Sequence, residues 1–170
     1  MNLWRDLKAI DHYTNGAKID TIRAIVEIPK GSILKYEYEP SGRYLTIVRE
    51  MKKRYRYPFN YGIIPQTLAG DEDPLDAIII YDQPIPAGTV VNCKIYGVIR
   101  MIDNGQEDDK ILCIPYFGLN KKVNLKKICY YLDHYKSPYQ EGTVTVGIEG
   151  YKEAEKTVNG SIKRFKERYL

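Results

Sequence analysis

The chain has 170 residues, of which 44% are hydrophobic and 28% charged, and this length is that of one ordinary domain. General disorder is excluded, because disordered chains lack the apolar residues that offset the entropy of ordering. The 26 Lys and Arg against 22 Asp and Glu leave a net charge of +4, which is too small to indicate a partner. We therefore expect a single domain that covers residues 1–170.

The cysteines and the hydrophobic runs indicate the compartment. Cys93, Cys113 and Cys129 form an odd set without a CxxC pair, which supports neither a disulfide framework nor a zinc site. Charged residues interrupt the apolar ones at the N-terminus, so a signal-peptide hydrophobic region is absent there, and no run approaches the length of a membrane span. We expect a cytoplasmic protein with no membrane partner.

Alternation of apolar and polar residues predicts β-strands over most of the chain. Three runs between residues 22 and 50 alternate at period two and predict a meander of antiparallel strands: 22–28, 33–39 and 44–50. Further strands are expected in short runs rich in Ile, Val and Tyr: 77–81, 90–100, 110–116 and 143–148.

Two segments near the C-terminus have helical spacing instead. Apolar residues recur every three or four positions over 125–132 and over 154–165. Continuing the first helix at about 100° per residue places Tyr135 and Lys136 on its apolar side, and His134 on the solvated side. The pattern indicates a mainly β (α+β) fold, a barrel-like sheet with two helices packed on it.

The strongest chemical signal is an acidic segment just before the apolar strand expected at 77–81. The segment 71–76 contains four acids: Asp71, Glu72, Asp73 and Asp76. Its spacing does not match a calcium EF-hand loop. Acidic turns are common, so this segment alone fits a solvated turn as well as it fits a site.

A second acidic segment favours a metal site. Residues 103–109 also contain four acids and lie between two expected strands. Two unit charges about 4 Å apart repel by about 4 kcal/mol at an effective dielectric constant of about 20, so convergence of the two segments would require cations. Carboxylate oxygens suit Mg²⁺, with Mn²⁺ as a possible substitute, and do not suit zinc. With no Walker loop or nucleophile elbow in the sequence, metal-assisted phosphoryl chemistry is the economical enzyme hypothesis.

Two strands carry cations that could serve such chemistry. Lys35 and Glu37 share one face of their expected strand, where an ordinary solvated face is the simpler interpretation. Arg49 is expected to share its face with Leu45 and Ile47. Its guanidinium would then point inside the barrel or at its mouth, where it could bind an anion such as phosphate.

An aromatic segment leaves a second class of function open. Residues 57–62, YPFNYG, follow the basic run KKRYR at 52–56, for which we find no role in the sequence. The segment is either a buried turn whose tyrosines pack the core, or a strip in which rings stack on bases. The alternative function is therefore an OB-fold module that binds nucleic acid without hydrolase activity. Two acidic segments argue against it, because they would repel phosphates.

Taken in order, these motifs resemble those of soluble family I inorganic pyrophosphatases. The order is VEIP, KYE, an Arg after a strand, YPxNYG, DxDPLD, an Asp followed by EDxK, and HYK, and it extends from about residue 22 to residue 152. The resemblance implies a small five-stranded OB-like β-barrel with two flanking helices. It also implies Mg²⁺-dependent hydrolysis of inorganic pyrophosphate to two phosphates, with several Mg²⁺ ions in each site and no nucleic-acid partner.

The same resemblance implies a role for each candidate site residue. Asp73 is expected to take the proton from the attacking water. The metal ligands are expected to be Asp71, Asp76, Asp103, Asp108 and, through water, Glu37. The phosphoryl groups are expected to contact Lys35, Arg49, Tyr61, Lys110, Tyr135 and Lys136. Glu27 and Tyr57 would support the site from behind. Compact members of this family are often hexamers, so by analogy we expect a homo-oligomer.

Overall fold

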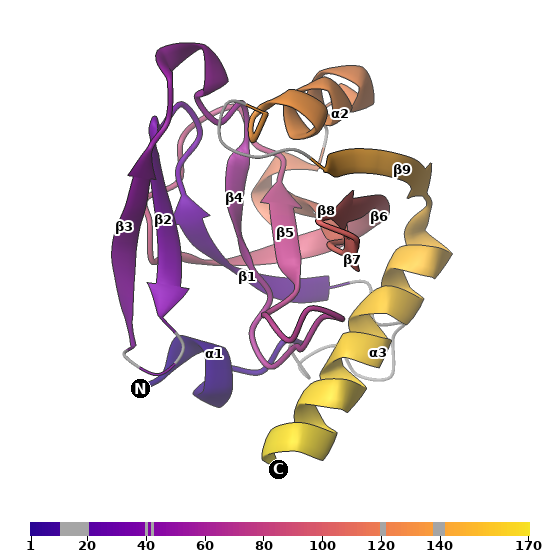
Figure 1. Cartoon of the computed structure of the whole chain (residues 1–170). Coiled ribbons are helices and arrows are strands. Elements are labelled where there is room, and N and C mark those ends of the chain that lie inside the picture. The colour runs from indigo at the N-terminus through magenta and orange to yellow at the C-terminus, as the bar shows by residue number, and fades with distance from the viewer. Residues whose placement is uncertain (11–20, 40, 42, 120–121, 138–141) are drawn as a thin grey trace.

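The computed structural model describes residues 1–10, 21–39, 41, 43–119, 122–137 and 142–170 (Figure 1). The strands are β1 (Thr21–Ile28), β2 (Leu34–Glu39), β3 (Tyr44–Glu50), β4 (Asn60–Ile63), β5 (Asp76–Ile79), β6 (Val90–Asp103), β7 (Gln106–Glu107), β8 (Lys110–Pro115) and β9 (Thr143–Glu149). The helices are α1 (Leu3–Asp6), α2 (Leu125–His134) and α3 (Tyr151–Tyr169), with single 3-10 turns at η1 (Lys53–Tyr55) and η2 (Tyr116–Gly118).

Five of the strands close into a barrel. The hydrogen-bonded order is β1-β4-β5-β8-β6, and β6 pairs with β1 to complete the ring. β6 can do so because its 14 residues are long enough to pair with β8, β1 and β9. β5 and β8 are parallel, whereas the other neighbours in the ring are antiparallel. The expected five-stranded OB-like barrel is confirmed, with α2 and α3 as its flanking helices (Figure 1).

The predicted meander is wrong in one respect, because β1 does not pair with β2. Both edges of β1 are occupied, by β4 at Ile25–Ile28 and by β6 at Thr21–Ile25. Among the described strands, β2 and β3 pair with each other in a separate two-stranded sheet. The turn after β1 contains Gly31 at φ +86°, whose N–H donates to the Tyr57 carbonyl at 2.7 Å. This hydrogen bond holds the turn against the segment before β4. The chain therefore leaves β1 at this turn, and the β2–β3 hairpin lies apart from β1.

The aromatic segment at 57–62 leads into the strand β4 (Asn60–Ile63), which the sequence pattern did not predict. All four of its residues are buried. The rings of Tyr57, Phe59 and Tyr61 are also buried, and they pack with Tyr131 of α2 in one part of the core. Of the two interpretations that the sequence left open, the core packing of these tyrosines is therefore the one observed. The short α1 and β7 were not predicted either.

Gly62 of β4 is required by the close approach of β1. A Cβ atom at this position would lie 1.8 Å from the Ile25 carbonyl oxygen, which is far inside van der Waals contact. We expect Gly62→Ala to lower the free energy of unfolding by about 3 kcal/mol in urea titrations. Gly147→Ala in β9, where a Cβ meets nothing within 4 Å, is the matched control. Equal losses in the two variants would contradict this account of Gly62.

The two long helices bury the faces that their spacing predicted. In α3 the side chains of Ala154, Val158 and Phe165 are buried against the barrel. The Phe165 ring also lies edge-on to Trp4 of α1, with 5.2 Å between ring centroids. No helix in the described part of the chain combines the length and apolarity that crossing a membrane requires. All three cysteines are free thiols.

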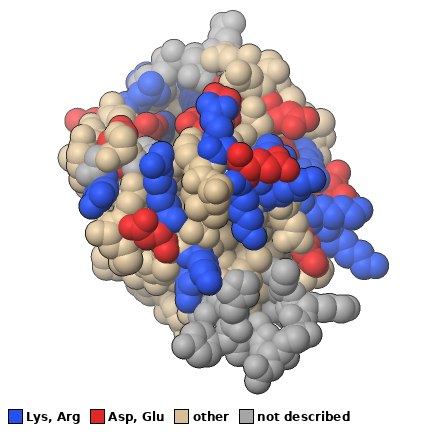
Figure 2. All heavy atoms as spheres, turned by 90° about the horizontal axis from the view of Figure 1, so that it is seen from below, with Lys and Arg blue, Asp and Glu red and all other residues tan. Residues whose placement is uncertain are grey.

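Charges of both signs share the face that carries α1 and the end of α3. Seen from below, Lys and Arg side chains gather there with Asp and Glu among them (Figure 2). Arg168 of α3 forms a salt bridge of 3.5 Å with Glu72, whose side chain is 71% exposed. Glu72 has φ +68°, a left-handed backbone conformation. This acid of the first acidic segment therefore pairs at the surface with the end of α3.

Candidate active site

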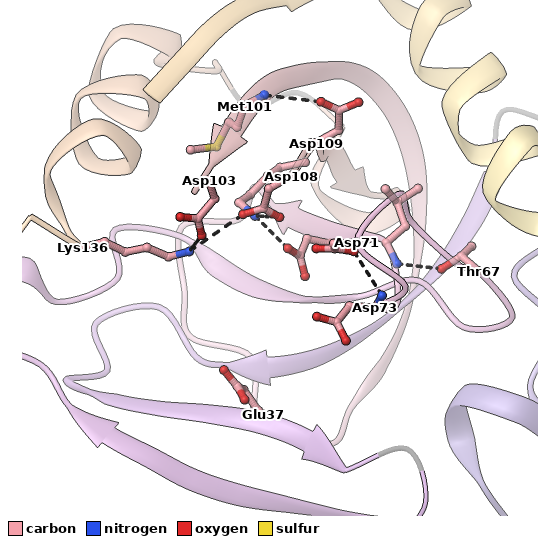
Figure 3. A network of polar contacts seen from close by, with 12 residues as sticks. Glu37, Thr67, Asp71, Asp73, Met101, Asp103, Asp108, Asp109 and Lys136 are labelled. Atoms are coloured by element: carbon pink, nitrogen blue, oxygen red, sulfur yellow. Dashed lines mark hydrogen bonds and ion pairs between the residues drawn. The ribbon is translucent and has the colours of Figure 1, made fainter. Parts of the chain in front are cut away.

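The two acidic segments meet at one cavity of about 360 Å³ beside the barrel. In Figure 3 the carboxylates of Asp71, Asp73, Asp103 and Asp108 surround a common space, with Glu37 on the β2 side of it. Nearly all of the candidate site residues line the cavity: Glu27, Lys35, Glu37, Tyr57, Tyr61, Asp71, Asp73, Asp76, Asp103, Asp108, Lys110, Tyr135 and Lys136.

The barrel topology explains this convergence. β5 and β8 are parallel neighbours with Asp76 opposite Lys110, so the segments that precede them reach the same edge of the sheet. β6 runs antiparallel to β8, so its last residue, Asp103, also lies at that edge. Strand pairing therefore brings together acids that are about thirty residues apart in the sequence.

Lys110 is the buried cation of the cavity. Its ammonium group donates to Asp76 Oδ2 at 2.7 Å and to Asp108 Oδ1 at 2.8 Å, while its side chain is 1% exposed. Burial opposes the charge of Lys110, but the two carboxylates outweigh it and raise the pKa of the lysine above its ordinary value. Lys110 therefore stays protonated and holds Asp76 and Asp108 together.

Lys136 forms the second cationic contact, just after α2 ends. Its ammonium group forms a salt bridge with Asp103 and lies 3.9 Å from Asp108 Oδ2. Burial would raise the pKa of Asp103, but the hydrogen bond and charge of Lys136 outweigh burial and lower that pKa. Tyr135 is buried and lines the cavity as well. The helical spacing therefore predicted the direction of both residues correctly.

Histidine takes no part in the cavity that the structure describes. The His134 side chain is exposed and its ring stacks on Tyr130, as its place on the solvated side of α2 predicted. His12, which stands in a polar N-terminal stretch, lies outside the described residues. The titratable side chains among the described residues that line the cavity are carboxylates, lysines and tyrosines.

Two aspartates of the cavity have raised pKa values. Burial raises the pKa of Asp108 to about 6, and the charge of Asp76 adds to this effect. Partial burial raises the pKa of Asp73, helped by Asp71 and Asp76, while its own N–H donates to Asp71 Oδ1 at 3.1 Å. Eight carboxyl groups but only three lysines line the cavity, so the described residues leave an excess of negative charge there.

This excess is what a divalent cation would relieve. Among the described residues, no three His, Cys, Asp or Glu side chains already form a closed metal-binding group. The donors are carboxylate oxygens, and burial together with the charges of neighbouring acids raises the pKa values of Asp73 and Asp108. Such an open set of oxygen donors fits Mg²⁺, which keeps several of its waters and takes few protein ligands.

Glu27 lies at the inner wall of the cavity and is buried. Its Oε1 accepts a hydrogen bond of 2.7 Å from the Tyr38 N–H. Burial raises the pKa of Glu27 from 4.5 to about 8. The folded protein therefore binds a proton on Glu27 at neutral pH that the unfolded chain has released.

This difference predicts how stability depends on pH. A proton held by the folded state stabilises it below pH 4.5, and this contribution is lost as the pH rises to about 8. We expect Glu27 to make the free energy of unfolding fall by about 1 kcal/mol per pH unit across this interval. Glu27→Gln keeps the acceptor for Tyr38 but does not titrate, so its urea midpoints should fall less steeply between pH 5 and pH 8. Parallel curves for the parent and the variant would rule out this assignment.

The β2–β3 hairpin brings Lys35 and Glu37 to the cavity but places Arg49 differently from the prediction. Lys35 and Glu37 share a face, as predicted, and form a salt bridge of 2.6 Å. A bulge shifts the register between Lys35 and Tyr36, so Arg49 stands opposite Lys35. The expectation that Arg49 shares the face of Leu45 and Ile47 is therefore wrong, because the bulge inserts one residue into β3. Arg49 is not among the residues that line the cavity.

Sequence reasoning missed a network that supports the second acidic segment. Arg100 of β6 bonds to Asp109 Oδ2 at 2.6 Å, to Thr157 Oγ1 at 2.8 Å and to Glu149 Oε2 at 2.9 Å. Asp109 is thereby directed towards the backbone of Met101 and away from its neighbour Asp108 (Figure 3). The sequence signal was Arg100 itself, a cation inside the apolar run 97–102.

The cavity combines carboxylates, which are ligands for a divalent cation, with lysines, which can contact an anion. The sequence model described as inorganic pyrophosphatase matches residues 24–166. The inorganic pyrophosphatase of Synechocystis sp. is 33% identical over 159 residues, which cover 88% of this chain and 94% of that protein. The chain therefore belongs to the inorganic pyrophosphatase family.

Solved structures agree with this assignment. The inorganic pyrophosphatase from Thermus thermophilus matches with a TM-score of 0.85 at 27% identity, over 98% of this chain and 99% of that one. The inorganic pyrophosphatase from Neisseria gonorrhoeae matches with a TM-score of 0.80 at 32% identity, over 86% of this chain and 92% of that one.

Proposed function

We propose that the chain hydrolyses inorganic pyrophosphate to two phosphates in the cavity described above, with Mg²⁺ as its cofactor. The observation that carries the proposal is the meeting of eight carboxyl groups with three lysines in one cavity of about 360 Å³. Pyrophosphate is a compact polyanion with little apolar surface, so its site must supply cations from the protein and from metals. Membership of the inorganic pyrophosphatase family supports this substrate.

In this proposal the metal ligands are the carboxylates of the two acidic segments. Asp71, Asp76 and Asp108 would hold the first Mg²⁺, Asp76 would also contact a second, and Asp103 with Asp108 would bind one that arrives with the substrate. Glu37 would bind a further ion through water, and Mn²⁺ is the expected substitute. Bound Mg²⁺ would supply charge neutralisation and a lowered pKa for a water molecule that it holds.

Asp73 is the proposed base. A carboxylate accepts a proton more readily when its pKa is raised towards that of the donor, and partial burial beside Asp71 and Asp76 raises the pKa of Asp73. The hydrogen bond from the Asp73 N–H to Asp71 Oδ1 fixes the turn that presents it. Asp73 would receive the proton as the water attacks phosphorus opposite the leaving phosphate.

The remaining polar residues would hold the two phosphoryl groups. The ammonium groups of Lys110 and Lys136 contact carboxylates in this structure and would turn towards phosphate oxygens when the substrate binds. Tyr61 and Tyr135 would donate hydrogen bonds, because burial raises the pKa of both phenols well above the ordinary value and keeps them protonated. The set proposed to contact phosphate is Lys35, Arg49, Tyr61, Lys110, Tyr135 and Lys136, with Glu27 and Tyr57 behind it.

We place the activity in the cytoplasm and in a homo-oligomer, with the hexamer expected by family analogy. Three free thiols are consistent with a reducing compartment. The nucleic-acid alternative is not favoured, because the rings of the aromatic segment are buried in the core.

Metal dependence tests the proposed function directly. Phosphate release from pyrophosphate is expected with Mg²⁺, to a lesser extent with Mn²⁺, and not in excess chelator, because the cavity acids need cations before they can accept an anion. The measurement is colorimetric phosphate release at fixed free metal concentration. Salt-sensitive binding of an oligonucleotide without any hydrolysis would support the nucleic-acid module instead.

A further inference from the structure

Two consecutive acids, Asp108 and Asp109, stand between the end of β7 and the start of β8. β7 and β8 pair with β6 on either side of these acids in the same register, so the acids interrupt one antiparallel ladder. The Asp108 N–H donates to the Met101 carbonyl at 2.9 Å, and the Met101 N–H donates to Asp109 Oδ1 at 3.4 Å. The side chain of Asp109 therefore helps to hold both acids against β6.

The two acids point to opposite sides of this short stretch (Figure 3). Asp108 lines the cavity and accepts a hydrogen bond of 2.8 Å from Lys110. Asp109 does not line the cavity and bonds to Arg100 instead. Successive side chains alternate between the two sides of an extended chain, so a rotation that moves one of these acids also moves the other. The direction of Asp108 therefore depends on what holds Asp109.

Arg100 of β6 is the cation that holds Asp109. Its Nη1 donates to Asp109 Oδ2 at 2.6 Å, and the Asp109 side chain is 16% exposed. A carboxylate that is largely removed from water needs such a partner, since an unpaired buried charge is strongly destabilising. Loss of Arg100 would therefore turn Asp109 towards water and away from the Met101 N–H.

The same guanidinium also contacts the side of the barrel that carries α3. Arg100 Nη1 donates to Thr157 Oγ1 of α3 at 2.8 Å. Arg100 Nη2 donates to Glu149 Oε2, at the end of β9, at 2.9 Å, and the Glu149 side chain is 43% exposed. Arg100 therefore has a structural role towards α3 and a separate contact with Asp109, and substitutions of its partners can test the two apart.

We propose that Arg100 is a positioning residue for the metal site: its pairing with Asp109 keeps that acid out of the cavity and directs Asp108 into it. The assignment rests on the proposed function, in which Asp108 is a metal ligand. It also predicts a sign that charge alone does not. Removal of a cation makes the surroundings more negative, which by itself would tighten Mg²⁺ binding, whereas loss of a residue that orients a ligand weakens it.

The test is Arg100→Met in the full chain, with Mg²⁺ alone as the probe and binding measured by titration calorimetry without substrate. Mg²⁺ should bind about tenfold more weakly than in the parent, the lower end of the range for losing a group that orients a metal ligand. Arg100→Lys can still pair with Asp109 and should recover most of the affinity. Arg100→Gln, which also lacks the charge, should weaken binding as Arg100→Met does, and it serves if the methionine variant does not fold.

A second substitution in the same variant tests the part played by Asp109. Asp109→Asn added to Arg100→Met should restore the Mg²⁺ affinity to within about threefold of the parent, because the amide oxygen can accept from the Met101 N–H but needs no cation. In excess chelator, the Asp108 N–H should exchange with solvent about tenfold faster in Arg100→Met than in the parent, since the segment is then held less firmly.

Glu149→Gln and Thr157→Val are the matched controls. Each weakens or removes another contact of Arg100 and leaves the pair with Asp109 in place. Both should bind Mg²⁺ within about twofold of the parent, even where weaker docking of α3 lowers the urea midpoint.

Several outcomes would overturn the assignment of Arg100. They are Mg²⁺ binding in Arg100→Met that is as tight as in the parent or tighter, equal weakening in either control, and no recovery on adding Asp109→Asn. A parent chain that binds Mg²⁺ but does not hydrolyse pyrophosphate would overturn the proposed function alone. A parent chain that binds no Mg²⁺ would overturn both.

Discussion

Asp73→Asn is expected to lower kcat for pyrophosphate by about a thousandfold, which is within the range for loss of a general base. The amide keeps the shape of the carboxyl group but cannot take the proton from the attacking water. The metal ligands proposed above are untouched by this change, so Mg²⁺ should still raise the thermal midpoint of the variant as it does in the parent. Steady-state kinetics and thermal unfolding with and without Mg²⁺ measure the two effects separately.

Glu72→Gln is the matched control for Asp73. Glu72 neighbours Asp73 in the same turn, but it is 71% exposed and pairs with Arg168 at the surface. The kcat of Glu72→Gln should stay within about twofold of the parent value, because exposed ion pairs contribute little to stability. If Asp73→Asn retained near-parent turnover, the base would have to be another carboxylate of the cavity.

Lys110→Met is expected to lower the free energy of unfolding by about 3 kcal/mol at neutral pH in excess chelator. The substitution preserves most of the side-chain volume but removes the charge that holds Asp76 and Asp108 together at 2.7 and 2.8 Å. Mg²⁺ should recover more stability in the variant than in the parent, because the two carboxylates then lack the buried ammonium group between them. Urea titrations with chelator and with Mg²⁺ measure both changes.

Lys35→Met is the matched control, because it shows how much the free energy of unfolding falls when a lysine that is not buried is lost. Lys35 also lines the cavity, but its partner Glu37 has a side chain that is 53% exposed. Its loss should cost about 0.5 kcal/mol, as for other exposed pairs. Identical urea midpoints for Lys110→Met and the parent in chelator would contradict a structural role for the buried ammonium group.

Much of the fold was predictable because its elements have strong local patterns. Period-two alternation located β1, β2 and β3 within one residue of their ends. Helical spacing located α2 and α3 and directed Tyr135 and Lys136 towards the barrel. β4 was missed because its four residues are all buried and therefore do not alternate.

The pairing of β1 and the face of Arg49 could not be predicted for a different reason. Each depends on which strand lies alongside, and a local pattern contains no information about a neighbour that is distant in sequence. β4 and β6 pair with the two edges of β1, so β1 has no edge left to pair with β2. A single bulge in β3 turned Arg49 to the face of Lys35.

For the candidate site, local sequence was enough to establish the chemical groups: two acidic segments at strand ends, and lysines and tyrosines in recognisable order. Their meeting in one cavity came from the parallel pairing of β5 with β8, which sets Asp76 opposite Lys110 at one edge of the barrel. The pairing of buried Lys110 with Asp76 and Asp108 depends on the same register. Residue type sets which charges are available, but strand register sets the distances between them, and electrostatic energy depends on both.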